Sequence, residues 1–189
     1  MCIRDSLRSV QKAFEYIGFD ATITRDRQDL LNASHVVLPG VGAIRNAMQN
    51  LAHTGLDDVI RACVKQGKPL FGICLGMQLL LEQSYEYGKT QCLSLIPGEV
   101  VPFDFGDNPK RLKIPHMGWN TLEPQGACVY FVHSYHATNV PPEFVWSTTT
   151  YGYEFVCAIK RDNIRATQFH PEKSGQVGLS MLLDFAQSR

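Results

Sequence analysis

The sequence predicts an α/β fold, in which a mostly parallel sheet is covered by helices on both faces and an antiparallel β region is added in the second half. Three observations indicate this fold class. Before Pro97, short apolar segments alternate with amphipathic helical segments, which is typical of parallel sheets. After Pro97, strand-like segments follow one another with turn residues between them. The chain has 189 residues, 44% of them hydrophobic, which suits one domain over residues 1–189 with a substantial core.

The first half is expected to alternate helices and strands. Residues 7–17 place their apolar side chains on one helical stripe and are followed by Gly18, a residue that commonly ends helices. Further helices are predicted over residues 44–51, 56–66 and 76–84, and strands over residues 21–24, 35–38 and 69–73.

Short strands and one closing helix are predicted after Pro97. The helix over residues 177–187 carries Leu179, Leu182 and Leu183 on one face. The strands are expected over residues 99–103, 129–132, 144–149, 155–160 and 164–169.

Residues 1–6 do not fit this plan. A parallel α/β sheet normally opens with an apolar strand that leads into the first helix, and these residues supply few apolar side chains. They are either a short edge strand or the place where a first strand is missing or has been replaced. The second interpretation is favoured.

Charge and cysteine usage exclude several classes of function. Eighteen basic residues balance eighteen acidic ones, so no net field attracts nucleic acid or an anionic membrane. The apolar runs fall well short of the roughly 20 residues that span a bilayer. The six cysteines include no CxxC pair, and their spacings match neither a zinc site nor a disulfide framework. We therefore expect a soluble protein of the reducing cytoplasm, without a metal or other cofactor.

The strongest chemical signal is Gly72-Ile73-Cys74-Leu75-Gly76, between a predicted strand and a predicted helix. In this pattern the two glycines let backbone segments approach closely, so that a central nucleophile is held on an exposed turn. The following helix favours the reactive thiolate, and the N–H of Leu75 lies where an oxyanion would develop. A buried structural cysteine beside two packing glycines is the less favoured alternative.

A cysteine nucleophile needs a base, and His170 is the best candidate of the six histidines. Pro171 holds His170 in an extended conformation, in which Glu172 lies on the same face. The carboxylate would fix the imidazole tautomer and stabilise the imidazolium, as the third member of a catalytic triad does.

A second glycine-rich turn, Pro39-Gly40-Val41-Gly42, follows a neighbouring predicted strand. It can supply another N–H donor, so Val41 and Gly42 are assigned with Leu75 to an oxyanion hole. A phosphate-binding loop is excluded because no Lys-Ser/Thr pair follows. A plain turn is the remaining alternative.

These motifs together resemble the class I (triad) glutamine amidotransferase family. The resemblance rests on P-G-V-G, G-I-C-L-G-M-Q and Q-F-H-P-E-K-S, and it covers the chain from Leu7 onward. It implies a three-layer, flavodoxin-like fold. It also implies that Cys74 attacks the side-chain amide of glutamine, giving a thioester and ammonia, while His170 transfers the proton and Glu172 orients it.

The resemblance further implies a set of residues that hold the amino-acid end of glutamine. Gln78 lies one helical turn beyond Cys74 and would face the same pocket. Glu86 has the charge that a cationic α-amino group requires, with a solvated loop glutamate as the alternative. The full set is Gly42, Gln78, Glu86, Ser134 and Tyr135.

Residues 115–120 and 130–135 resemble one branch of the family, whose members pass ammonia to a (β/α)8 cyclase subunit. Ammonia is largely protonated in neutral water, so the mouth of the site should dock on this partner in a heterodimer. Trp119, Tyr130 and Lys173 are expected at the interface. Trp119 is the best anchor, because a large aromatic residue in a predicted loop is a poor core residue, and packing into its own domain is the alternative.

Three alternatives belong to other functional classes or branches. A stand-alone cysteine hydrolase, such as a peptidase, would not need residues 115–120 or Gln78. An inactive partner-binding relative would be expected to lack a member of the triad. An amidotransferase that serves a different synthase is the closest competitor, and residues 115–120 distinguish it.

Overall fold

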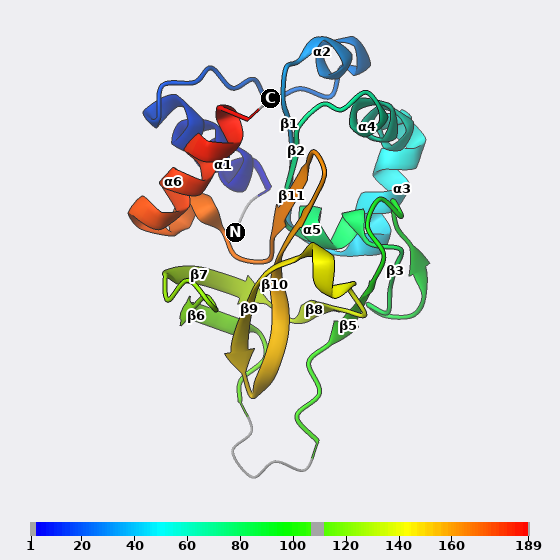
Figure 1. Ribbon diagram of the computed structural model, residues 1–189. Coiled ribbons are helices and arrows are strands. Elements are labelled where there is room, and N and C mark those ends of the chain that lie inside the picture. The colour runs from blue at the N-terminus through cyan, green and yellow to red at the C-terminus, as the bar shows by residue number, and fades with distance from the viewer. Residues whose placement is uncertain (1–2, 107–111, 189) are drawn as a thin grey trace.

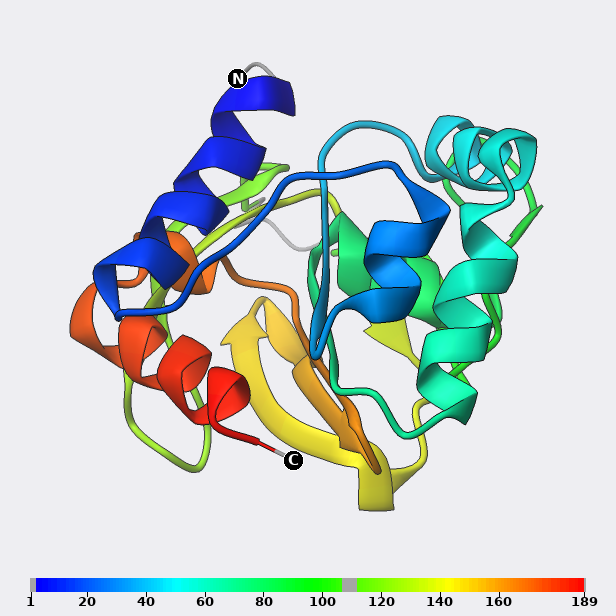
Figure 2. The same ribbon diagram turned by 90° about the horizontal axis from the view of Figure 1, so that it is seen from above.

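The structure is a computed structural model that describes residues 3–106 and 112–188. Within these residues a central sheet lies between two groups of helices (Figures 1 and 2). The helices are α1 (Ile3–Tyr16), α2 (Arg27–Asn32), α3 (Ile44–Thr54), α4 (Leu56–Lys65), α5 (Leu75–Leu80), α6 (Gly175–Ala186) and the 3₁₀ turns η1 (Pro142–Phe144) and η2 (Pro171–Lys173). The strands are β1 (Val36–Gly40), β2 (Leu70–Cys74), β3 (Gln83–Ser84), β4 (Thr90–Gln91), β5 (Glu99–Pro102), β6 (His116–Thr121), β7 (Cys128–His133), β8 (Tyr135–Thr138), β9 (Val145–Tyr151), β10 (Tyr153–Arg161) and β11 (Ile164–Thr167).

The main sheet joins a parallel part to an antiparallel part. Its strand order is β1-β2-β11-β10-β8-β5-β3-β4, and β9 pairs with β10. Strands β1, β2 and β11 run parallel, whereas β10 pairs antiparallel with β11, β8 and β9. Strands β6 and β7 form a separate antiparallel pair. The α/β fold class with an added antiparallel region in the second half is confirmed.

Alternating side chains of β2 supply the cores on both faces of the sheet. Leu70 packs into the cluster under α3, α4 and α5, whereas its neighbour Phe71 packs into the cluster under α1 and α6. Figure 2 shows the two groups of helices on opposite sides of the sheet. A third cluster, which includes Phe131, Phe155 and Phe169, joins the β6-β7 pair to the antiparallel part.

Several elements differ from the sequence-based expectation. Residues 21–24 form no strand, and the side chain of Gln11 on α1 donates to the Ala21 carbonyl at 2.8 Å. The helix that was expected over residues 76–84 ends at Leu80. Helix α2, which Asp26 caps, was not predicted, and neither were the short strands β3, β4 and β8 or strand β6.

The structure gives residues 3–6 a helical conformation, as the first part of α1. The interpretation of this segment as an edge strand is therefore wrong for these residues. On the side away from β2, strand β1 has no partner strand among the described residues. That a first strand is missing or replaced over residues 1–6 stays a prediction.

Candidate active site

The nucleophile turn forms as the glycine pattern predicts. Strand β2 ends at Cys74, and α5 begins at Leu75. Cys74 has a φ of 55° and a ψ of −106°, a conformation that a residue with a side chain adopts only under strain. A Cβ atom on Gly76 would lie 1.7 Å from the Leu38 carbonyl oxygen, and one on Gly72 would lie 3.0 Å from the Gly76 backbone. Position 76 therefore requires glycine, and a side chain at position 72 would be tightly crowded.

The parallel pairing of β2 and β11 brings the triad together. Thr167 at the end of β11 is opposite Ile73, so the chain emerges from the sheet beside Cys74 and then continues to His170. His170 Nδ1 lies 2.8 Å from Glu172 Oε1, and the Cys74 side chain is close enough to His170 to raise the pKa of the imidazole. The three side chains lie together in the predicted order, and their roles as nucleophile, base and orienting carboxylate stay a prediction.

The electrostatics favour a charged imidazole in this triad. Burial alone would lower the pKa of His170, but hydrogen bonds and charge interactions with Cys74 and Glu172 outweigh burial and raise it to about 9. The Glu172 side chain is fully buried, and its Oε2 has no hydrogen-bond partner among the described residues. A protonated His170 therefore balances a buried carboxylate charge at neutral pH.

Backbone contacts with β7 hold His170 in place. The His170 N–H donates to the Tyr130 carbonyl at 3.0 Å. The buried Ser174 hydroxyl donates to the His170 carbonyl at 2.6 Å and accepts from the Tyr130 N–H at 3.0 Å. Ser174 was not among the predicted site residues. Its place in the motif that carries His170 and Glu172 was the available signal.

The proposed oxyanion residues lie at the same sheet edge as Cys74. Gly40, the last residue of β1, is paired in register with Cys74, and Val41 and Gly42 follow it directly. Gly42 has a φ of 100°, which favours glycine. Leu75 is the first residue of α5, and the N–H of a first helical residue has no acceptor within the helix. Their use as oxyanion donors stays a prediction.

Gln78 is buried at the centre of the site and is bonded to other protein groups. Its Nε2 donates to the Tyr135 carbonyl at 3.1 Å and to Gln168 Oε1 at 2.9 Å. The Gln168 Nε2 in turn lies 3.7 Å from Cys74 Sγ. Gln168 was not among the predicted site residues, although it opens the Q-F-H-P-E-K-S motif that carries His170 and Glu172.

Glu86 and Tyr135 also lie together. Burial raises the pKa of the Tyr135 hydroxyl, and the neighbouring Tyr87 and Glu86 raise it further. Glu86 Oε2 accepts from the Ile44 N–H at 2.6 Å, at the start of α3. The Glu86 carboxylate thus has a structural partner, and its role as a ligand for the substrate amino group stays a prediction. The role of Ser134 and Tyr135 in substrate binding also stays a prediction.

Trp119 and Tyr130 face each other across the β6-β7 pair, with their ring centroids 6.0 Å apart. A loop was expected around Trp119, but the residue lies in strand β6, and its side chain is 58% exposed. Met117 on the same face of β6 is 61% exposed. Lys173 follows Glu172 directly in η2. The β6-β7 pair lies beside α6 (Figure 1), so an exposed apolar face adjoins the segment that carries His170.

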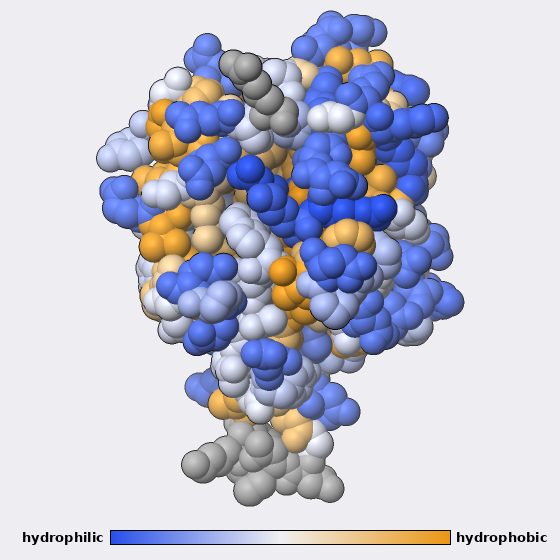
Figure 3. Space-filling model, in the orientation of Figure 1, coloured by the Kyte–Doolittle hydropathy of each residue, from blue (hydrophilic) through white to orange (hydrophobic). Residues whose placement is uncertain are grey.

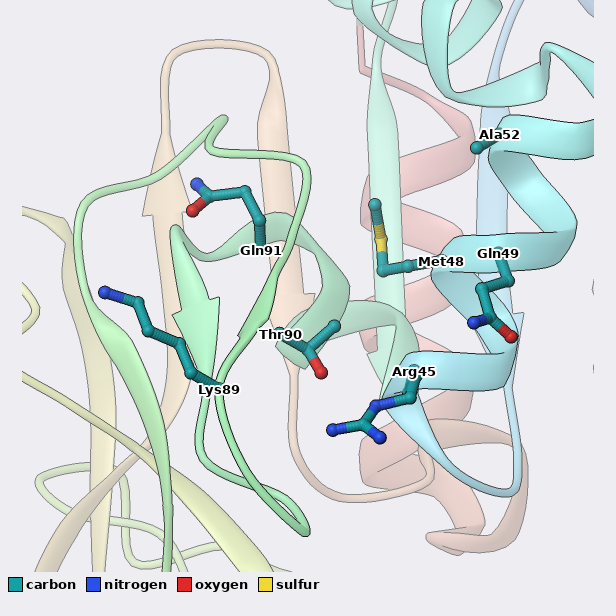
Figure 4. Close-up of a pocket in the computed structure, with 7 residues that line it drawn as sticks. All are labelled: Arg45, Met48, Gln49, Ala52, Lys89, Thr90 and Gln91. Carbon is teal, nitrogen blue, oxygen red and sulfur yellow. The ribbon is translucent and has the colours of Figure 1, made fainter.

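An open cavity of about 550 Å³ lies elsewhere, between α3 and the segment around β4 (Figure 4). Arg45 and Met48 line one side of it, and Lys89 and Thr90 line the other. None of the triad residues lines this cavity. On the face seen in Figure 3, apolar residues form separate spots between hydrophilic ones.

Among residues 3–106 and 112–188, no group of three or more His, Cys, Asp or Glu side chains is placed to hold a metal ion. In the same part of the chain, every helix is too short or too polar to cross a lipid bilayer.

Comparisons with known proteins agree with this geometry. A family model described as "Glutamine amidotransferase class-I" matches residues 2–187. A protein of Geobacter sulfurreducens named "Imidazole glycerol phosphate synthase subunit HisH" is 48% identical, with 97% of this chain and 94% of that protein covered. One of the same name from Caldanaerobacter subterraneus is 44% identical, with 96% and 93% covered.

Solved structures show the same fold. A "Crystal structure of glutamine amidotransferase" superposes with a TM-score of 0.74 at 20% identity, over 96% of this chain and 94% of that chain. A chain in the "Structure of PurLQS from Thermotoga maritima" gives a TM-score of 0.66 at 16% identity, over 95% and 92% of the two chains. The chain belongs to the class-I glutamine amidotransferase family.

Proposed function

We propose that residues 1–189 form one glutamine amidotransferase domain, which is the glutaminase subunit of imidazole glycerol phosphate synthase. One observation carries the proposal: a cysteine on a strained strand-to-helix turn contacts a histidine that a buried carboxylate orients. The relatives named as subunits of that synthase, which match nearly the whole chain, support this choice of synthase.

The proposed reaction uses Cys74 as the nucleophile and His170 as the group that carries the proton. The Cys74 thiolate attacks the side-chain carbonyl carbon of glutamine, and the oxyanion receives N–H donors from Leu75 and the 41–42 turn. The His170 imidazolium gives its proton to the leaving nitrogen, so that ammonia departs and a thioester remains. Neutral His170 then takes a proton from water, which attacks the thioester and releases glutamate. Cys74 is a thiolate and His170 an imidazolium again at the end of the cycle.

The proposed partner is a (β/α)8 cyclase subunit, which forms a heterodimer with this chain in the cytoplasm. The cyclase would use the ammonia to make imidazole glycerol phosphate and AICAR in histidine biosynthesis. Exposed Met117 and Trp119 support a docking face, as does an adjoining cavity of about 530 Å³ that Ile114 and Pro115 help to line. This face lies next to the triad, because β7 hydrogen-bonds the backbone of His170. Ammonia would therefore pass between the two proteins without entering bulk water.

The test is a glutaminase assay of this chain with and without the cyclase and its nucleotide substrate. We expect hydrolysis of glutamine in the complex, with equal amounts of glutamate and of cyclase product formed and no ammonia released into the solution. Cys74→Ser is the matched control, because it keeps the side-chain volume and should abolish hydrolysis. No glutamine hydrolysis by the wild-type complex, or unchanged hydrolysis by Cys74→Ser, would overturn the proposal.

A further inference from the structure

A chain of hydrogen bonds links strand β6 to the sulfur of Cys74. We propose that Gln168 is a positioning residue whose side-chain amide donates to Cys74 Sγ, that the Tyr135 carbonyl fixes its orientation through Gln78, and that a relay of hydrogen bonds beginning on β6 holds this carbonyl in place. The relay consists of Asn120, His116, His133, the Tyr135 carbonyl, Gln78 and Gln168. The proposal rests on the proposed function only in taking Cys74 as the nucleophile.

The Tyr135 carbonyl oxygen fixes the direction of the relay, because a carbonyl can only accept. It lies 2.8 Å from His133 Nδ1 and 3.1 Å from Gln78 Nε2. His133 must therefore carry its proton on Nδ1, and Gln78 must turn its NH2 group toward Tyr135. Both assignments follow from the backbone acceptor alone.

The inner part of the relay ends at the nucleophile. The second N–H of Gln78 donates to Gln168 Oε1 at 2.9 Å, which leaves the Gln168 NH2 group 3.7 Å from Cys74 Sγ. The two glutamine side chains are almost completely buried, so water cannot replace their bonds. If the Gln168 amide were reversed, its NH2 group would face the NH2 group of Gln78, and its oxygen would face the Cys74 sulfur. The relay thus presents a donor to Cys74, which favours the thiolate.

In the outer part of the relay every hydrogen bond is donated toward the Tyr135 carbonyl, which therefore accepts from both His133 and Gln78. His133 Nε2 is left as an acceptor and lies 3.0 Å from His116 Nδ1, which donates to it. His116 Nε2 is then an acceptor and lies 3.3 Å from Asn120 Nδ2. Burial lowers the pKa of His116 to about 4 and that of His133 to about 3, so both rings are neutral at neutral pH. A neutral ring is required, because each imidazole donates through one nitrogen and accepts through the other.

The backbone also fixes the outer end of the relay. Asn120 Nδ2 donates to the Thr150 carbonyl at 2.9 Å, and Asn120 Oδ1 accepts from the Thr121 N–H at 2.8 Å. Asn120 and His116 lie on the inner face of β6, whereas Met117 and Trp119 are exposed on the other face. One strand therefore carries both the proposed docking surface and the start of the relay to Cys74.

The test measures how fast iodoacetamide alkylates Cys74 in the full chain at neutral pH, read from the mass of the peptide that contains Cys74. The peptide readout is needed because Cys128 is exposed and also reacts. Gln168→Glu keeps the shape of the side chain but replaces the donor with a carboxylate oxygen, and Gln168→Met removes the donor without adding charge. We expect each to slow alkylation about tenfold, the effect of losing a hydrogen bond to a charged group.

Substitutions at His116 test the relay far from the sulfur. His116→Phe keeps the ring that stacks on Tyr151 but cannot donate to His133, and should slow alkylation by about threefold, a smaller and indirect effect. His116→Asn restores a donor and should recover most of the rate. Tyr151→Phe is the matched control: it removes a hydroxyl that donates to the Lys113 carbonyl, in the same cluster but outside the relay. Its alkylation rate should equal that of the wild type.

The outcomes separate this proposal from the proposed function, because alkylation requires neither glutamine nor a partner. Wild-type alkylation rates in folded Gln168→Glu and Gln168→Met would overturn the role of Gln168. If Gln168→Glu fails to fold, Gln168→Met and His116→Phe decide. Equal rates in His116→Phe and Tyr151→Phe would overturn the relay. Slower alkylation in a chain that hydrolyses no glutamine would support the positioning role and contradict the proposed function.

Discussion

The charge on His170 is the central feature of the site at the scale of single residues. Its pKa is raised to about 9 because Cys74 and Glu172 both favour the imidazolium, against the effect of burial. In Cys74→Ser a neutral hydroxyl replaces the thiolate of the proposed reaction, so the pKa of His170 should fall. Titration of the His170 ring protons by NMR in the two proteins measures this change. An unchanged pKa in Cys74→Ser would show that the thiol does not contribute to it.

Glu172 is expected to act by fixing the tautomer of His170. Glu172→Gln keeps the shape of the side chain, but its amide can present a donor to Nδ1 and so favour the wrong tautomer. We expect kcat for glutamine hydrolysis to fall about 10³–10⁴-fold, the size of the effect in triads whose orienting carboxylate is replaced. KM should change little, because Glu172 is buried behind His170. Steady-state kinetics of the complex measure both values, and a rise in KM at constant kcat would point to a role in binding instead.

The residues that sequence reasoning identified are those within compact motifs. Cys74 with its flanking glycines, and His170 with Glu172, each lie within a few positions of one another, so local geometry could be argued from spacing. Gln168 hydrogen-bonds Cys74, which lies about half the chain away in the sequence. Only the pairing of β2 with β11 brings the two residues together. No spacing argument could have shown that contact.

Strands β6 and β7 carry the buried histidines whose titration should limit stability in acid. The native pKa values of His116 and His133 are lowered to about 4 and about 3 because both rings are buried. The unfolded chain therefore binds more protons below about pH 6.5, the ordinary histidine value. The two histidines contribute fully to the free energy of unfolding above that pH, and this contribution is lost as the pH falls toward 4. For His116 the loss is about 3 kcal/mol.

His170 has the opposite dependence, because its pKa is raised. Its contribution is complete below about pH 6.5 and is lost as the pH rises through about 9. These groups together predict a maximum of the unfolding free energy near pH 6.5. Urea unfolding across this range measures the free energy. His116→Phe should make the unfolding free energy depend less on pH on the acid side only, and Cys74→Ser on the alkaline side only. Equal pH dependence in the wild type and both variants would contradict the assignment of these histidines.

Element lengths explain which parts of the fold could be predicted. Helices α3, α4 and α6 have periodic apolar patterns and were found close to their observed bounds, whereas α1 begins four residues before the expected start at Leu7. Strand β6 was missed because Gly118 and Asn120 interrupt a strand-like pattern, although its burial alternates from residue to residue. The expected strand over residues 21–24 does not form, since a strand needs a neighbour, which no local pattern reveals.

At the scale of the whole molecule, the exposed face of β6 should couple this chain to its partner. Trp119 makes its ring contact with Tyr130 and is otherwise more than half exposed, so Trp119→Ala should leave the fold intact. We expect weaker binding of the cyclase, by about 2 kcal/mol if Trp119 is a hot spot, or ammonia that leaks instead of forming product. Calorimetric titration together with the ratio of ammonia to cyclase product measures both effects. Normal binding and full coupling in Trp119→Ala would show that the docking face lies elsewhere.

The most direct test of the account is to find the covalent intermediate. The complex is quenched in acid during turnover with saturating glutamine, and the peptide that contains Cys74 is analysed by mass spectrometry. We predict a glutamyl group on the Cys74 sulfur in the wild type, and none in Cys74→Ser. A glutamyl group on another residue, or rapid hydrolysis of glutamine with no group on Cys74 at any time, would contradict the account.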